Sequence, residues 1–323
     1  PPPSDISSYR AKYLGGLSQV TFSRVGDNYG SDLDPTGTWM AFVSTRNTRQ
    51  PQIYLKNLKG GTAVTLKTNQ ATPCIHPRFS PDGRYIAYAS YRNGNYDIWV
   101  MDAHRNTAHR QITKTGFHEL HPSWSPDGKK IAFMAYTDRG EWDIQFIDLT
   151  TYQTDSVATG LFPEWSPVQG DDTLVFQKAR GRDVPWYGVW TVKTDGSQLT
   201  EVVAEADWAA IEPSWSPDGK WIVFTSVYKS IESRKENRKT RGDDVWIVRR
   251  DGTGQRRLTT DSRPDWSPRW GPDRKIYFSS TRNHSANIWT VNVPDLAVTD
   301  SSGTAADADK LLQEADALLG AGE

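Results

Sequence analysis

Hydrophobic and polar positions along this chain alternate in short runs, and the order of the runs repeats. An apolar run such as Ile86–Ala89 follows a polar turn, and a second run such as Ile98–Val100 comes shortly afterwards. Short runs that alternate or are apolar throughout predict β-strands rather than helices. Because the same order of turn, strand, loop and strand returns along the chain, the pattern predicts an all-β repeat protein.

A four-residue motif, Ser-Pro-Asp-Gly, separates the first two strands of each predicted repeat. It is complete at residues 80–83, 125–128 and 216–219, degenerate at 166–170 and 271–273, and weakest at 34–37. Proline presets φ and glycine accepts a positive φ, so the motif predicts a tight turn. The apolar residue before each copy lies at 33, 79, 124, 165, 215 and 270. This spacing fits the roughly 40–50 residues of a four-stranded propeller blade, with insertions late in the chain.

Further strands complete the predicted blades. Third strands are expected at 97–100, 143–147, 189–192, 244–248 and 287–291, and fourth strands at 110–113, 198–200 and 257–259. The last blade lacks a fourth strand because Pro294 and a polar stretch follow its third. Residues 18–22 form a spare strand before the first blade. We expect this strand to pair with the last blade and to close a six-bladed ring, which removes exposed sheet edges.

These elements divide the chain into four predicted segments. An N-terminal extension (1–16) precedes the propeller (17–293), and a polar linker (294–306) leads to a C-terminal amphipathic helix (307–323). The apolar stripe of this helix is Leu311, Leu312, Ala315, Leu318 and Leu319. The segment resembles the first helix of a tetratricopeptide repeat. One helix cannot bury such a stripe alone, so it either docks on the propeller or a partner, or the natural chain continues.

The Ser-Pro-Asp-Gly repeat, preceded by tryptophan in two of its complete copies, resembles the TolB-like six-bladed propeller family. The resemblance covers roughly residues 17–293 and is weakest at 34–37 and 166–170. It implies a protein of the bacterial periplasm or the cell exterior that docks other proteins. The same repeat also builds the propellers of prolyl-oligopeptidase-like enzymes, and propeller lyases of related sequence exist, so the fold does not decide the function.

Composition narrows the classes of function. The chain has 323 residues, 24% of them charged, with a formal net charge of −1. The balance of charge does not favour nucleic acid, and no apolar run has the roughly 20 residues of a membrane span. Cys74 is the single cysteine, which excludes an internal disulfide framework. No Gly-x-Ser-x-Gly elbow or glycine-rich phosphate loop occurs.

The loops predict a charged binding face. Loops between second and third strands carry an excess of basic residues, whereas the loops between blades carry an excess of acidic ones. The face is therefore expected to be acidic near the axis and basic at its rim, which suits an acidic protein or a polyanion; exposed loops are also commonly charged without a role. The rim candidates are Arg46, Arg92, Arg234, Lys235, Arg238, Lys239 and Arg282.

Three residues at matching positions of different blades are expected to converge on the channel. His76 and His121 each precede the proline of their repeat, and Glu212 holds the same slot, as does Phe162. Two histidines and a carboxylate are a conceivable metal site. Water-linked polar groups are the alternative. A pairing of Cys74 with His76 as a nucleophile is a further alternative to a buried structural thiol.

The leading hypothesis is a non-catalytic, protein-binding or scaffold propeller, one part of a larger bacterial envelope or extracellular assembly. It predicts protein partners, no cofactor, no nucleic acid and no membrane span, with a cation in the channel as an option. Two alternatives stay open: a lyase or hydrolase with a channel metal, and a propeller that binds glycans or small ligands.

Overall fold

A computed structural model describes residues 16–48, 50–68, 71–105, 109–181, 186–206, 208–228, 243–260 and 263–293. The chain divides into two units, Pro1–Asn292 and Val293–Glu323, and the first contains all of the described strands. The predicted C-terminal helix, with Leu311, Leu312, Ala315, Leu318 and Leu319, lies outside the described residues. No helix in the described part of the chain is suited to crossing a membrane.

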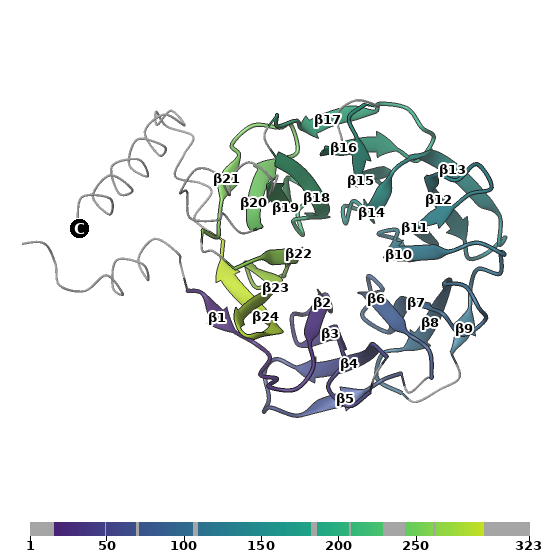
Figure 1. Cartoon of the computed structure of the whole chain (residues 1–323). Helices are drawn as coiled ribbons and strands as arrows, with labels where there is room; N and C mark the ends of the chain where they lie inside the picture. The colour runs from purple at the N-terminus through teal and green to yellow at the C-terminus, as the bar shows by residue number, and fades with distance from the viewer. Residues whose placement is uncertain are drawn as a thin grey trace, which may run out of the picture. The chain divides into compact units, whose positions relative to one another are not determined.

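The first unit is a ring of six four-stranded antiparallel sheets, which confirms the predicted propeller (Figure 1). Blades one to three consist of β2 (Asn28–Leu33), β3 (Trp39–Ser44), β4 (Gln52–Asn57) and β5 (Val64–Leu66); β6 (Cys74–Phe79), β7 (Tyr85–Ser90), β8 (Asp97–Asp102) and β9 (Arg110–Gln111); and β10 (Glu119–Trp124), β11 (Lys130–Tyr136), β12 (Trp142–Asp148) and β13 (Thr154–Thr159).

Blades four to six continue the same order, except that the last blade takes its outer strand from the N-terminus. They consist of β14 (Leu161–Trp165), β15 (Thr173–Ala179), β16 (Tyr187–Lys193) and β17 (Thr200–Val203); β18 (Trp208–Trp215), β19 (Trp221–Tyr228), β20 (Asp244–Arg249) and β21 (Arg256–Arg257); and β22 (Asp265–Trp270), β23 (Lys275–Asn283), β24 (Ser285–Asn292) and β1 (Ser18–Gln19). The first strand of each blade lies innermost (Figure 1).

The Ser-Pro-Asp-Gly motif forms the predicted turn between first and second strands. In blade two, Gly83 donates its N–H to the Ser80 carbonyl at 2.8 Å and has φ of 71°. The Ser80 hydroxyl donates to the Asp82 carboxylate at 2.5 Å and accepts the N–H of Tyr85 at 2.9 Å. The same bonds recur in the complete copies of blades three and five. The serine and aspartate therefore hold the turn, and neither is free for binding.

Blade four differs in two ways, one expected and one not. Its turn is different, as predicted, because Asp171 rather than a glycine donates the closing N–H to the Val168 carbonyl at 3.0 Å. The prediction for its fourth strand was wrong: the strand runs over Thr200–Val203 and not over residues 198–200. Gln198 has φ of 53°, so the turn extends past it and delays the pairing.

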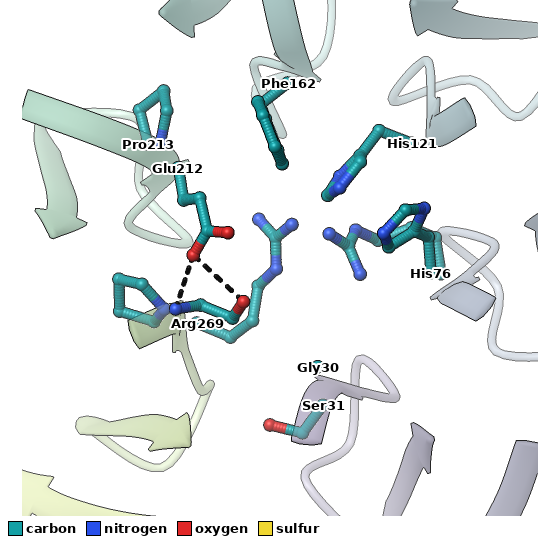
Figure 2. A pocket seen from close by; sticks show the side chains of 11 residues that line it. Gly30, Ser31, His76, His121, Phe162, Glu212, Pro213 and Arg269 are labelled. Atoms are coloured by element: carbon teal, nitrogen blue, oxygen red, sulfur yellow. Dashed lines mark hydrogen bonds between the residues drawn. The ribbon is translucent and has the colours of Figure 1, made fainter. Parts of the chain in front are cut away.

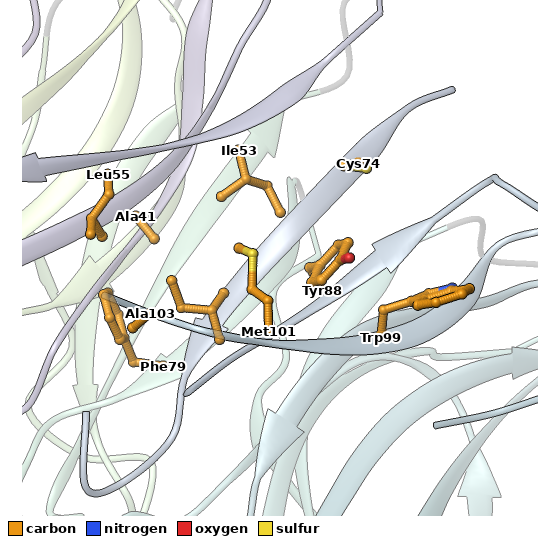
Figure 3. Close-up of a cluster of buried hydrophobic side chains, with 10 residues drawn as sticks. Ala41, Ile53, Leu55, Cys74, Phe79, Tyr88, Trp99, Met101 and Ala103 are labelled. Carbon is orange, nitrogen blue, oxygen red and sulfur yellow. The ribbon is translucent and has the colours of Figure 1, made fainter. Parts of the chain in front are cut away.

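The core lies between blades rather than within them. One cluster joins Ile53 and Leu55 of blade one to Ile86 and Met101 of blade two (Figure 3). The second strand of every blade also contributes one fully buried aromatic ring, the set being Phe42, Tyr88, Phe133, Phe176, Phe224 and Phe278. Each blade buries its apolar face only against its neighbours, so the packing requires a complete ring.

The N-terminal strand closes the ring, as predicted. β1 pairs with β24, with Ser18 opposite Thr290. The Thr21 hydroxyl then accepts the N–H of Ile288 at 2.9 Å. Threonines after the outer strands of other blades accept the corresponding N–H in the same way, namely Thr68, Thr113 and Thr259. Residues 18–21 therefore occupy the position of a true fourth strand.

The equivalence of Thr21 and Thr68 can be tested by substitution. Thr21→Ala leaves a buried N–H without its acceptor, which is expected to lower the free energy of unfolding by about 1–3 kcal/mol. Thr68→Ala should cost a similar amount, because it removes the same bond from a blade with a continuous chain. Urea denaturation measures both. An unchanged midpoint for Thr21→Ala would show that the closing strand does not hold the ring.

Candidate functional site

One residue in each innermost strand has a left-handed backbone, and together these six residues form a ring around the axis. They have φ of 50–59° and are Gly30, His76, His121, Phe162, Glu212 and Ser267. The pairing with the second strand shifts register at each of them, so each is part of a β-bulge. Left-handed φ is uncommon for residues other than glycine. Its repetition in six blades points to one shared structural requirement.

The bulge directs side chains of this ring into the channel. Figure 2 shows His76, His121, Phe162 and Glu212 converging on the channel centre, as the sequence predicted for these slots. Gly30 and Ser267 complete the set and were missed. Their position in the repeat would have identified them, because each of the six residues lies three residues before the end of its first strand.

Three neighbouring slots form a ladder of rings. The centroids of the His76 and His121 imidazoles are 3.6 Å apart, and the ring of Phe162 lies 4.1 Å beyond that of His121. Burial, together with the nearby charge of Arg78, lowers the pKa of His76 to about 3. Burial also holds the pKa of His121 well below its usual value, with His76 and Arg78 adding to the effect. Both imidazoles are therefore neutral at physiological pH.

Glu212 is held by the next blade. Its Oε2 accepts the N–H of Ser267 at 2.6 Å and the hydroxyl of Ser267 at 2.9 Å. Its own N–H donates to Gln177 at 2.9 Å. Burial raises the pKa of the Glu212 carboxyl, while the bonds from Ser267 and the charge of Arg78 oppose the rise. Glu212 thus links adjacent blades and keeps one carboxylate oxygen, Oε1, for the channel.

A second set of polar residues, two positions after the left-handed ring, also links blades. Asp32 accepts the N–H of Phe79 at 2.7 Å, and Ser123 accepts that of Trp165 at 2.9 Å. Glu164 accepts the N–H of Trp215 at 3.0 Å, and its other oxygen contacts the guanidinium of Arg269. Each bond joins one blade to the next. Most of the polar content of the channel wall is therefore structural.

Arg78 also belongs to this second set, but its guanidinium bonds to no neighbouring blade. The residue is 8% exposed, and its Nη1 donates to the carbonyl of Pro77 at 2.7 Å. Among the described residues no carboxylate oxygen lies within 4.0 Å of its guanidinium. Burial lowers the pKa of Arg78, and the charges of Asp32 and Glu212 oppose that effect.

The channel has little free space and offers no evident metal site. The cavity between Arg78, His76, His121, Glu212 and Arg269 has a volume of about 20 Å³. Within the described ranges, no three His, Cys, Asp or Glu side chains gather as ligands for a metal ion. The rings of His76 and His121 lie against each other at an interplanar angle of 33°. The cation suggested by the sequence thus has no three-ligand set in this part of the chain.

Cys74 is fully buried and does not contact His76 as a reactive pair. Its sulfur lies 3.5 Å from the hydroxyl of Ser90, and burial raises the pKa of its thiol. A raised pKa suppresses the thiolate that a nucleophile requires.

The described arginines of the predicted rim contact their own blades. The guanidinium of Arg92 lies 4.0 Å from the ring centroid of Trp99, and that of Arg46 lies 5.5 Å from Tyr54. Arg282 makes two bonds to the buried Asp265, at 2.7 and 2.6 Å. These contacts stabilise loop starts. The remaining rim candidates, Arg234, Lys235, Arg238 and Lys239, lie outside the described residues.

Two neighbouring groups of aromatic side chains lie on the loops and strand ends of blades two and three. Tyr91 and Tyr96 have ring centroids 5.1 Å apart, and both lie against His118, at 6.1 and 5.8 Å. Tyr136 donates its N–H to the His118 carbonyl at 2.8 Å, and its ring is 5.2 Å from that of Trp142. We refer to these five residues with Phe117 as the loop-face aromatic surface.

This surface combines exposure with a fixed backbone. Tyr91, Phe117 and Tyr136 are 36%, 43% and 37% exposed. The Asn95 amide donates to the carbonyl of Phe117 at 2.6 Å, and the N–H of Tyr96 donates to the His118 ring at 3.1 Å. The sequence did not reveal the surface, because its residues come from three loops. The available signal was a tyrosine at the end of the second strand in both blades.

Comparisons with known proteins place the chain among related propellers. The family described as the tricorn protease N-terminal β-propeller domain matches residues 97–306, and the TolB β-propeller domain matches residues 30–141. The chain is 29% identical over 86 residues to the Tol-Pal system protein TolB of Roseobacter denitrificans, which covers 27% of the chain and 19% of that protein. It is 25% identical over 202 residues to the uncharacterized peptidase YuxL of Bacillus subtilis, which covers 59% and 28%. The chain thus spans less than a third of either relative.

Solved structures confirm the fold. TolB from Acinetobacter baumannii superposes with a TM-score of 0.58 at 17% identity, covering 89% of this chain and 67% of that one. Oligogalacturonate lyase from Vibrio parahaemolyticus has a TM-score of 0.58 at 14% identity, covering 87% and 97%. One of these two structures is named as an enzyme and the other is not. Both kinds of protein therefore share this propeller fold.

The contact of Glu164 with Arg269 gives a stability prediction. The two side chains are 16% and 13% exposed, and Glu164→Gln leaves Arg269 without its counter-charge. We expect the free energy of unfolding in urea to fall by about 3 kcal/mol. Glu141→Gln, at an exposed position, is the control. The double variant Glu164→Gln/Arg269→Gln should recover part of the loss; a strictly additive loss would show that the two charges do not interact.

The neutral histidines give a pH prediction. Because their folded pKa values lie below the unfolded value of about 6.5, protons bind the unfolded state more strongly, and the stability they contribute is lost as pH falls below about 6.5. NMR of the His76 and His121 rings should show no protonation down to pH of about 5, in contrast to the same chain unfolded in urea. A chain with His76→Asn and His121→Asn, residues that tolerate left-handed φ, should lose less stability over this range. An equal loss of stability in both chains would show that His76 and His121 are not the source of this pH dependence.

Proposed function

We propose that this chain, which belongs to the tricorn N-terminal β-propeller family, is a non-catalytic protein-binding propeller that docks a partner through its loop-face aromatic surface. The observation that carries the proposal is the gathering of aromatic side chains on blades two and three, with three exposed aromatic residues on a backbone held by hydrogen bonds. It is supported by a relative that is named as a component of the Tol-Pal system.

The composition of this surface suits a protein partner. Tyrosine, tryptophan and phenylalanine are enriched in protein interfaces, where large rings bury much area at little cost in conformational entropy. The hydroxyls of Tyr91 and Tyr136 have no partner among the interactions of the described residues, so they can bond with groups that a partner buries. Because a rigid ring carries the loops, the partner meets a surface that is already formed.

The channel supports a binding role more than catalysis. Its two histidines are neutral and stacked, and Glu164 and Glu212 bond to neighbouring blades. The free space of the cavity is small, about 20 Å³. A larger assembly in the bacterial envelope or outside the cell is the setting that we propose for the partner.

Substitution of the exposed tyrosines tests the docking surface. Affinity capture from the native source with cross-linking identifies the partner, and calorimetry then measures its Kd. Tyr91→Ser and Tyr136→Ser should each weaken binding by roughly 30-fold if each ring is a hot spot worth about 2 kcal/mol.

Two exposed tyrosines supply matched controls. Tyr85 and Tyr152 are 38% and 48% exposed. Tyr85 begins β7 directly after the turn from the first strand, and Tyr152 lies on the turn after a third strand, so both are on the opposite face of the ring. Tyr85→Ser and Tyr152→Ser should leave Kd unchanged. If these variants weaken binding while Tyr91→Ser does not, the partner docks on the other face.

A further inference from the structure

We propose that the central channel is a binding site for a carboxylate group, held by the guanidinium of Arg78. This site is separate from the loop-face aromatic surface, and its ligand class goes beyond the docking of a protein partner there. Three features of the channel carry the assignment: an unpaired charge, a set of convergent polar atoms and a small cavity.

The first feature is the state of Arg78. Arg78 as a residue is 8% exposed. Its guanidinium donates to one backbone carbonyl and has no ion-pair partner among the described residues. The other channel arginine, Arg269, already contacts Glu164. A buried cation without a close counter-charge is costly, because water cannot replace the missing partner. An anion that enters the channel removes this cost.

The second feature is the convergence of polar atoms around that charge. Nδ1 of His76 is buried and has no hydrogen-bond partner, although the ring lines the same cavity. Figure 2 shows the guanidinium of Arg269 directed into the same space from the opposite side. A planar guanidinium matches the two oxygens of a carboxylate, and a neutral imidazole can donate a further bond. The group of donors therefore fits an anion rather than a cation.

The third feature is size. The cavity of about 20 Å³ holds one or two water-sized groups. A carboxylate is smaller than a phosphate, and its two oxygens match the planar fork of Arg78, so it is the anion that fits this space best. The ligand is therefore a carboxylate, carried either by a small free molecule or by the end or side chain of a partner protein.

Carboxyls that face Arg78 link the site to pH. Asp32 and Glu212 are the negative groups that act on Arg78, and Glu164 is occupied by Arg269. Burial raises the pKa of Asp32 to about 6 and also raises that of Glu212. As pH falls through about 6, Asp32 becomes neutral and stops competing for Arg78, while His76 and His121 stay neutral; the raised pKa of Glu212 acts in the same direction. Anion affinity should therefore rise on acidification.

Formate is the probe for the test, because it is small and stays ionised at the pH values used. The intact chain, labelled at histidine, is titrated with sodium formate at pH 5.5 and 7.5, and NMR follows the rings of His76 and His121. Sodium chloride at equal ionic strength runs in parallel. Saturable shifts of both rings with formate, tighter at pH 5.5 and absent with chloride, are expected.

Two variants that each remove one positive charge make the test specific. Arg78→Gln should weaken formate binding at least tenfold. Arg84→Gln is the matched control, because Arg84 is exposed on the turn of the same blade and should bind formate as the parent chain does. If Arg78→Gln does not fold, Arg78→Lys keeps the charge but not the planar fork, and it should bind formate more weakly than the parent.

A tripeptide with a free carboxyl terminus, compared with its amide, distinguishes the two sources. Binding of the free tripeptide alone assigns the site to a protein chain end, whereas binding of formate without the tripeptide assigns it to a small free carboxylate. Equal shifts with chloride, or no saturable shift at either pH, overturn the proposal. None of these results depends on whether Tyr91 or Tyr136 binds a partner.

Discussion

The structure depends on the pairing of β1 with β24, because that pairing makes a ring out of six sheets that cannot bury themselves singly. Each cluster of the core joins residues from adjacent blades, so every blade needs two neighbours. An open array would expose an apolar sheet face and a row of unpaired backbone groups at each end. The few residues of the N-terminal strand remove both defects, and Thr21 reproduces the bond that other blades make with their own chain.

Closure also decides what the channel contains. Once the ring is complete, the left-handed residue of each innermost strand faces five counterparts, and isolated polar side chains become a network. Asp32, Ser123 and Glu164 use this proximity to bond the following blade. The carbonyl of Arg78 accepts the indole N–H of Trp124 in the next blade, but its guanidinium makes no such link, and this charge is the feature of the wall that packing alone does not explain. Some charged groups of the channel, such as Asp32 and Glu164, thus have a structural role, whereas the guanidinium of Arg78 is available for a ligand.

The two proposals place two kinds of recognition on one scaffold. The aromatic surface offers broad apolar area of the kind that protein interfaces bury, whereas the channel offers a narrow and charged site. Propellers with this scaffold include proteins named as enzymes and proteins that are not. The fold therefore sets where recognition occurs, and the side chains set what is recognised. The rigid bulges and turns keep both sites formed before a ligand arrives.

The sequence by itself determined the six blades, their turns, the closing strand and four of the six channel positions. This was possible because these features follow from local rules that repeat: proline and glycine in a turn, alternating strands, and equal spacing. The tertiary structure alone decided the rest. Whether an arginine is paired, as Arg282 is, or unpaired, as Arg78 is, depends on residues far away in the chain. The aromatic surface likewise joins loops that only the packing of blades two and three brings together, and burial in the closed ring, which no local pattern encodes, keeps His76 and His121 neutral.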